Sequence, residues 1–113
     1  MKEDRVYLEY ILQCIKAIEE YSQGSKEQFL NNLLIQDAVL RRLQTLAEST
    51  QRLSAEIKEQ MPNIDWRSIS GFRNILVHDY LGGIDLDIVW EVVDRYLLEL
   101  KIEINNVLQN QED

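Results

Sequence analysis

Three side chains that could do chemistry together stand near the middle of the chain: Arg73, His78 and Tyr80. His78 is the only histidine of the sequence. An imidazole changes charge near neutral pH and can act as general base or acid. A guanidinium stays charged and forks onto phosphate oxygens. An arginine beside a histidine is therefore sufficient in principle to cleave RNA without a metal ion.

In this chemistry His78 takes the proton from a ribose 2′-hydroxyl, and Arg73 stabilises charge on the phosphate as that hydroxyl attacks. The expected product is a 2′,3′-cyclic phosphate. Five positions of separation put the two side chains about 140° apart on an ideal helix, so they share an edge rather than a face. A helix that loosens after Val77 would let His78 swing toward Arg73. The same residues also fit a plainer reading, in which His78 caps a helix end and Arg73 is a surface charge.

Composition describes the scaffold that must hold these groups. The 113 residues are 45% hydrophobic, enough for one domain with a real core. Four glycines and a single proline, Pro62, favour long helices over a sheet with many turns. The formal charge of −8 argues against broad binding to nucleic acid, so phosphate chemistry must be local or use a partner's positive charge.

Other classes of protein are disfavoured by the sequence. It has no apolar run of about 18 residues, and the charged residues 1–5 are not followed by a signal-peptide pattern. Cys14 is the only cysteine, so it cannot form an internal disulfide or a zinc site with one histidine. We therefore expect a cytoplasmic protein with no membrane span, no bound metal and no cofactor.

An apolar stripe at helical spacing predicts a first helix, with Asp4 as its N-cap and Gly24 as its stop. The next helix is expected from residue 25 or 26 to about residue 60, either continuous or broken near residues 49–50. Its predicted apolar face consists of Leu30, Leu33, Leu34, Leu40, Leu43 and Ala47.

Two carboxylates of this second helix, Asp37 and Glu48, need an explanation. Asp37 falls among the leucines, where a carboxylate costs free energy unless it is paired or solvated. Each of the two either reaches water from the edge of the helix, or bonds a basic or hydroxyl group near the site. The sequence leaves both interpretations open.

After Pro62, Asp65 is the predicted N-cap of a third helix that ends at or just past His78, before Gly82 and Gly83. Its expected buried side is Trp66, Ile69, Phe72, Ile75 and Leu76. A last helix opens at Asp85, and about five C-terminal residues should fray. The prediction is an all-α, single-domain antiparallel bundle of four or five helices spanning residues 1–113.

The pattern Arg73-Asn74-x-x-x-His78-x-Tyr80 resembles the Arg-x-x-x-x-His-x-Tyr motif of the HEPN superfamily. More narrowly, the chain resembles the HepT-like ribonuclease toxins of HEPN/MNT toxin–antitoxin systems. The similarity extends over roughly residues 29–100, through the segments 36–43, 47–53, 62–66 and 84–90.

The resemblance implies a homodimer in which two Arg/His motifs face each other across a groove and cut RNA without metal. It implies Arg73 and His78 as catalytic residues and Asn74 as a supporting one. Asp37 and Glu48, the two carboxylates of the second helix, are further supporting candidates on the residue argument given above. In such type VII systems the antitoxin is a minimal nucleotidyltransferase that transfers AMP from ATP to the motif tyrosine, here Tyr80. The added phosphates would place negative charge beside the motif and block RNA entry.

Some positions depart from the family pattern: Ala47 stands where the family often has Gly, and Leu97-Leu98 where Leu-Pro is usual. Gly82-Gly83 adds a glycine after the motif. These departures affect loop shape and antitoxin fit more than catalysis. Two other functions stay open: a non-catalytic helical module that docks a nucleotidyltransferase and binds its nucleotide or substrate, and a plain structural dimer.

Overall fold

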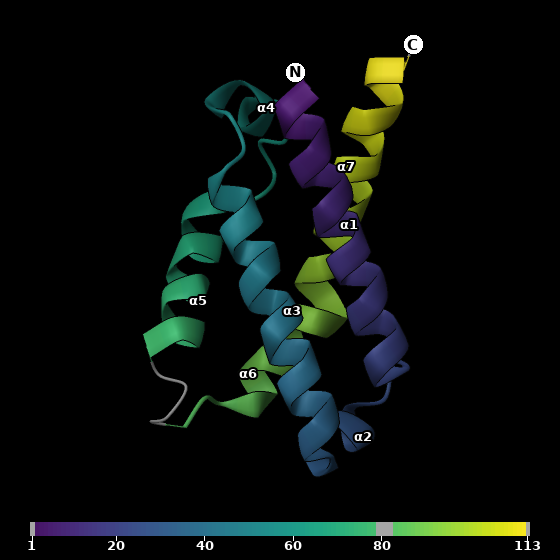
Figure 1. Ribbon diagram of the computed structural model, residues 1–113, viewed down its shortest axis with the longest axis vertical. Coiled ribbons are helices and arrows are strands. Elements are labelled where there is room, and N and C mark those ends of the chain that lie inside the picture. Colours follow the sequence, from purple (N-terminus) through teal and green to yellow (C-terminus); the bar gives the residue numbers. More distant parts are fainter. Residues whose placement is uncertain (1, 79–82, 113) are drawn as a thin grey trace.

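The computed structural model describes residues 2–78 and 83–112, and this part of the chain contains helices and no strand. It is an elongated bundle, 44 × 27 × 21 Å along its principal axes. The long helical segments run alternately down and up, so that neighbours are antiparallel (Figure 1). The predicted all-α helical bundle is therefore confirmed. Over these same residues, no helix is both long enough and apolar enough to cross a membrane.

The first half of the bundle is a pair of long helices, α1 (Lys2–Ser22) and α3 (Leu33–Gln51), joined by the short α2 (Lys26–Asn31). Gly24 follows α1 with a φ of +69°, a left-handed conformation that glycine adopts at little cost, so its predicted role as a stop is confirmed. The second predicted helix is broken at Asn32, whose side-chain oxygen accepts a hydrogen bond from a backbone N–H of α3 at 3.1 Å. An asparagine in an extended conformation is a good N-cap, and it restarts the helix here.

Part of the predicted apolar face of the second helix was wrong. Leu33 and Leu34 lie in the first turn of α3 and are 71% and 77% exposed, so they do not belong to the core. The buried residues of α3 begin only at Val39, so the first turn of this helix lies beyond the part that packs in the core. Leu40, Leu43 and Ala47 are buried as predicted.

Asp4 does not cap the first helix, because α1 begins at Lys2 and Asp4 lies inside it. It is only 5% exposed. Its two carboxylate oxygens accept hydrogen bonds from the backbone N–H of Ser54 at 2.8 Å and from its hydroxyl at 2.7 Å. Ser54 in turn is the N-cap of α4 (Ala55–Glu59). The aspartate therefore ties the start of α1 to the chain that follows α3.

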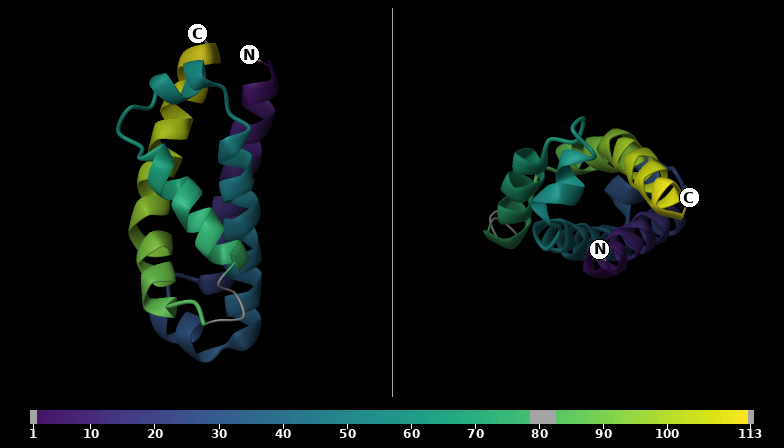
Figure 2. Two further views of the ribbon diagram at one scale, coloured as in Figure 1. Left: turned by 90° about the vertical axis from the view of Figure 1, so that its left-hand side faces the viewer. Right: turned by 90° about the horizontal axis from the view of Figure 1, so that it is seen from above.

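The second half comprises α5 (Trp66–His78) and one nearly continuous segment made of α6 (Leu86–Glu91), a π-helical turn η1 (Val92–Tyr96) and α7 (Leu97–Glu112). Helix α5 lies diagonally across the face formed by α3 and this last segment (Figure 2). The π-helical turn η1 was not predicted from the sequence, and insertions of this kind often occur at functional sites. It re-aims the side chains that follow α6.

The core joins buried apolar residues from all the described α-helices, and Val92 and Val93 of η1 pack against it while partly buried. Its largest fully buried side chains are Phe29, Leu8, Ile11, Ile15, Ile18, Leu43, Ile57, Met61, Ile104, Val39, Val89 and Cys14. The ring of Phe29 lies 5.6 Å from that of Trp90, which fastens α2 to α6. Ile75, predicted to be buried, is 45% exposed, because the side of α5 on which it lies borders a groove described below.

Candidate functional site

The start of α5, the helix that carries the motif, is fixed by local contacts. Asp65 caps it as predicted, accepting hydrogen bonds from the backbone N–H of Ser68 at 3.1 Å and from its hydroxyl at 2.7 Å. These bonds hold the pKa of Asp65 below its ordinary value. The ammonium of Lys58 lies 5.6 Å from the centre of the Trp66 ring. The orientation of α5 is therefore set a full two turns before its first motif residue.

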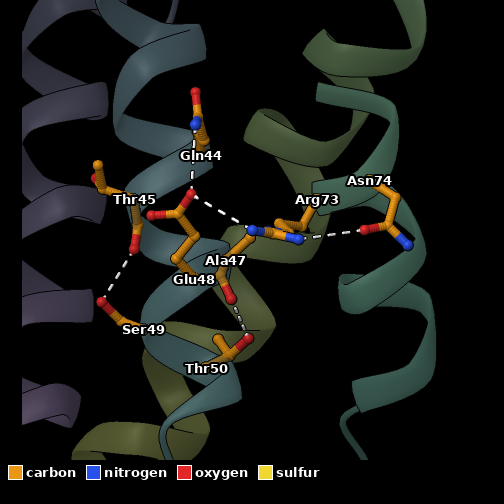
Figure 3. Close-up of polar contacts among 8 residues, drawn as sticks. All are labelled: Gln44, Thr45, Ala47, Glu48, Ser49, Thr50, Arg73 and Asn74. Carbon is orange, nitrogen blue, oxygen red and sulfur yellow. Dashed lines mark hydrogen bonds and ion pairs between the residues drawn. The ribbon is translucent and has the colours of Figure 1, made fainter. Parts of the chain in front are cut away.

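Arg73 projects from α5 toward α3, where its guanidinium meets Glu48 (Figure 3). The distance from Arg73 Nη2 to Glu48 Oε1 is 3.8 Å, and Arg73 Nη1 donates to the side-chain oxygen of Asn74 at 3.4 Å. The side chains of Arg73 and Glu48 are 31% and 41% exposed. The structure thus brings three of the predicted site residues together and places them at the surface rather than in the core.

The contacts of this group are long. Gln44, one turn before Glu48 on α3, donates to Glu48 Oε1 at 3.3 Å (Figure 3). Charge-assisted hydrogen bonds are usually 2.7–2.9 Å, so none of these contacts is a tight one. In addition, Arg73 Nε is buried with no hydrogen-bond partner among the described residues. The guanidinium is held in place while several of its N–H groups remain free for a ligand.

The sequence left two interpretations of Glu48 open. The structure favours the second, in which Glu48 pairs with a basic group near the site, here Arg73. Gln44 was missed. Its signal was its spacing, since a side chain four residues before Glu48 lies on the same face of the helix. Asp37 lies on α3 about 16 Å before Glu48 along the helix axis and is exposed.

His78 is the last residue of α5 and is exposed. Because α5 remains helical through His78, the loosening after Val77 that would swing the imidazole toward Arg73 is not present. On a regular helix the two side chains leave α5 about 140° apart, one toward α3 and the other toward solvent. Tyr80, the predicted modification site, lies outside the described residues.

A groove of about 610 Å³ opens between α5, α3 and the η1–α7 segment. Its walls are mostly apolar and include Phe72 and Ile75 of α5, Ala47 of α3 and Tyr96 of η1. Gly71 also lines it, and a Cβ added there would meet nothing within 4 Å. The sequence analysis did not predict this groove, because it depends on how α5 lies across two other segments.

Within residues 2–78 and 83–112, no group of three or more His, Cys, Asp or Glu side chains is arranged to hold an ion. The polar groups that meet around Arg73 are the carboxylate of Glu48, which Gln44 contacts through its amide, and the amide of Asn74.

Comparison with known proteins gives consistent matches. A family model described as Ribonuclease HepT-like matches residues 11–107. A Methanocaldococcus jannaschii protein named as a gamma-glutamylcyclotransferase and putative RNase is 36% identical over 109 residues, which is 96% of this chain and 49% of that protein. This chain thus spans about half the length of that relative.

Two further relatives match over most of both chains. A protein of Caldanaerobacter subterraneus subsp. tengcongensis named as a putative RNase is 33% identical over 112 residues, 98% of this chain and 99% of its own. A Thermococcus cleftensis protein named as a probable ribonuclease HepT is 33% identical over 96 residues, 84% of this chain and 86% of its own. No solved structure matches the chain.

Proposed function

We propose that this chain, which belongs to the ribonuclease HepT-like family, is an endoribonuclease that uses Arg73 and His78. One observation carries the proposal: the motif arginine lies at the surface beside Glu48 of another helix, and its contacts of 3.8 Å to Glu48 and 3.4 Å to Asn74 are too long to saturate its terminal N–H groups. A buried, fully paired arginine could not take a phosphate ligand. The exposure of His78 in the same helix supports the assignment.

In the proposed reaction His78 accepts the proton of a ribose 2′-hydroxyl, and the oxygen forms a new bond to the adjacent phosphorus. The bond from phosphorus to the 5′-oxygen breaks, and that oxygen leaves with a proton supplied by an imidazolium. Arg73 stabilises the negative charge that develops on the non-bridging oxygens. The products are a 2′,3′-cyclic phosphate and a 5′-hydroxyl, and no step in the scheme calls for a metal ion.

The active form in this proposal is a homodimer. The separation of Arg73 and His78 around α5 argues that one protomer does not by itself close the two groups on one phosphate. Two-fold symmetry would place two copies of each residue in one cleft. It would also concentrate positive charge on a chain whose formal charge is −8. A monomer at micromolar concentration that still cuts RNA would contradict this part.

The biological role that we propose is that of a toxin controlled by a minimal nucleotidyltransferase. The antitoxin would transfer AMP from ATP to Tyr80, breaking the bond between the α and β phosphates and releasing pyrophosphate. The support is the position of Tyr80 two residues after His78. Purified protein incubated with ATP and the transferase should gain mass in AMP units, and Tyr80→Phe should abolish the gain. A Tyr80→Phe protein that is still modified would show that the acceptor is a different residue.

Expression in a bacterial host tests the toxin directly. The parent should arrest growth, and Arg73→Ala or His78→Ala should each relieve the arrest while accumulating to the same level. Equal growth of all three strains would instead favour a helical module that docks a nucleotidyltransferase, since such a module needs neither side chain. Immunoblots of the three strains exclude differences in expression.

A further inference from the structure

We infer that Glu48 is a positioning residue for Arg73, holding its guanidinium between α3 and α5 through a contact long enough to leave terminal N–H groups available to a phosphate. The inference rests on the proposed function for its catalytic consequence. It rests on the structure for its physical basis, the 3.8 Å ion pair between two helices (Figure 3).

Part of the Arg73 guanidinium is buried without compensation. Arg73 Nε is buried and has no hydrogen-bond partner among the described residues, so it has lost its hydration without gaining a hydrogen bond. A charged group in that situation is driven out toward solvent unless an opposite charge offsets the loss. Among the described residues, Glu48 supplies the carboxylate that pairs with Arg73.

The contacts of Arg73 with Glu48 and Asn74 leave part of its hydrogen-bonding capacity unused. A guanidinium has five N–H groups. One donates to Asn74 at 3.4 Å, and the ion pair with Glu48 at 3.8 Å is too long to count as a hydrogen bond. Glu48 therefore fixes the position of the Arg73 guanidinium without occupying its N–H donors. A tight bidentate pair would do the opposite and compete with a phosphate.

The orientation of the Glu48 side chain is fixed by its neighbours in α3. Gln44 donates to the same carboxylate oxygen, Oε1, that faces Arg73, at 3.3 Å. The residue next to Glu48, Ala47, is 1% exposed, and its carbonyl accepts the hydroxyl of Thr50 at 2.6 Å. The carboxylate thus projects from a rigid, well-packed turn of helix, as a positioning group should.

The test compares Glu48→Gln with Glu20→Gln, which removes the same charge from an exposed position on α1. We expect Glu48→Gln to lower kcat for cleavage of a labelled RNA about tenfold, because Arg73 is no longer held where charge develops. KM should stay within about twofold, because the interaction that is weakened is the one with the charge that develops in the transition state. Glu20→Gln should leave both constants close to those of the parent.

A second readout does not depend on catalysis. The N–H of Arg73 Nε can be followed by nitrogen-15 NMR, and its hydrogen exchange should be slow in the parent and in Glu20→Gln. In Glu48→Gln we expect exchange at least about tenfold faster, since the side chain swings into water. Unchanged exchange and unchanged kcat would overturn the inference. A parent that cleaves no RNA, but whose Nε exchange still depends on Glu48, would overturn the proposed function and leave the positioning intact.

Discussion

Two carboxylates of this molecule each join parts of the chain that are distant in sequence, and they do so differently. Asp4 is 5% exposed and accepts two bonds of 2.7 and 2.8 Å from Ser54. Glu48, whose side chain is 41% exposed, faces Arg73 at 3.8 Å. The first contact satisfies every group that it buries, whereas the second leaves Arg73 Nε without a partner among the described residues.

The difference separates a saturated contact that stabilises the fold from an unsaturated one of the kind that the proposed phosphate site requires. Short hydrogen bonds to a buried carboxylate lower the free energy of the folded state and leave that carboxylate without a free acceptor for a ligand. Long contacts around the partly exposed guanidinium of Arg73 contribute little to stability but leave donors available.

Removing Arg73 or His78, the two proposed catalytic groups, should have the largest effect. We expect Arg73→Ala and His78→Ala each to slow RNA cleavage by about 100-fold or more, the usual contribution of a positioned acid–base or charged group. Since both side chains lie at the surface, the free energy of unfolding should change by less than about 1 kcal/mol. Cleavage rates and urea unfolding curves measured on the same preparations give both values. Loss of folding together with activity would mean that the site is structural.

Asp4→Ala should show the opposite pattern. Losing two hydrogen bonds at a buried carboxylate should destabilise the fold by about 2 kcal/mol, while cleavage per folded molecule stays unchanged. Glu3→Ala, the exposed neighbour in the same turn of α1, should cost less than about 0.5 kcal/mol. Urea unfolding measures the difference. If the two variants unfold at the same urea concentration, the contact with Ser54 does not stabilise the fold.

The groove side of α5 should accept a methyl group. We expect Gly71→Ala to stabilise the protein by about 0.5–1 kcal/mol, because alanine favours a helix and the added Cβ meets open space. Gly24→Ala provides a matched control of opposite sign, because the φ of Gly24 is +69°. Thermal unfolding of the two variants beside the parent decides the point. A destabilised Gly71→Ala would show that the groove is occupied in solution.

The smallest expected effect is a pH dependence of stability that comes from Asp65. Bonds from Ser68 lower the pKa of Asp65 in the folded state, so its contribution to stability is present above the ordinary aspartate range. That contribution is lost as pH falls through the lowered value. The difference in urea midpoint between the parent and Asp65→Asn should therefore shrink from neutral pH to about pH 2.5. A difference that is independent of pH would refute the assigned cap.

The helices and most of the core followed from periodicity, because an apolar stripe such as Ile11, Cys14 and Ile15 needs only local geometry to be recognised. The restart at Asn32 was missed because an asparagine inside a helical pattern shows its capping role only when the chain bends there. The π-helical turn η1 leaves no local signature, since Val92–Tyr96 contains no glycine or proline that would mark an irregular turn.

The site was predictable in part for the same reason. Arg73, Asn74 and His78 stand in one short motif, so their shared helix followed from the sequence. That Arg73 meets Glu48, and that Gln44 orients this carboxylate, depends on where α5 lies against α3. Such a placement is a tertiary property, and two open interpretations of Glu48 were as far as the sequence could go.

The most direct test of the central claim is a cleavage assay with purified protein and end-labelled RNA in excess EDTA. The account predicts fragments that end in a 2′,3′-cyclic phosphate, formed at the same rate as without the chelator, and formed about 100-fold more slowly, or slower still, with Arg73→Ala or His78→Ala. Cleavage that stops in EDTA, or that persists undiminished when both residues are replaced, would contradict it.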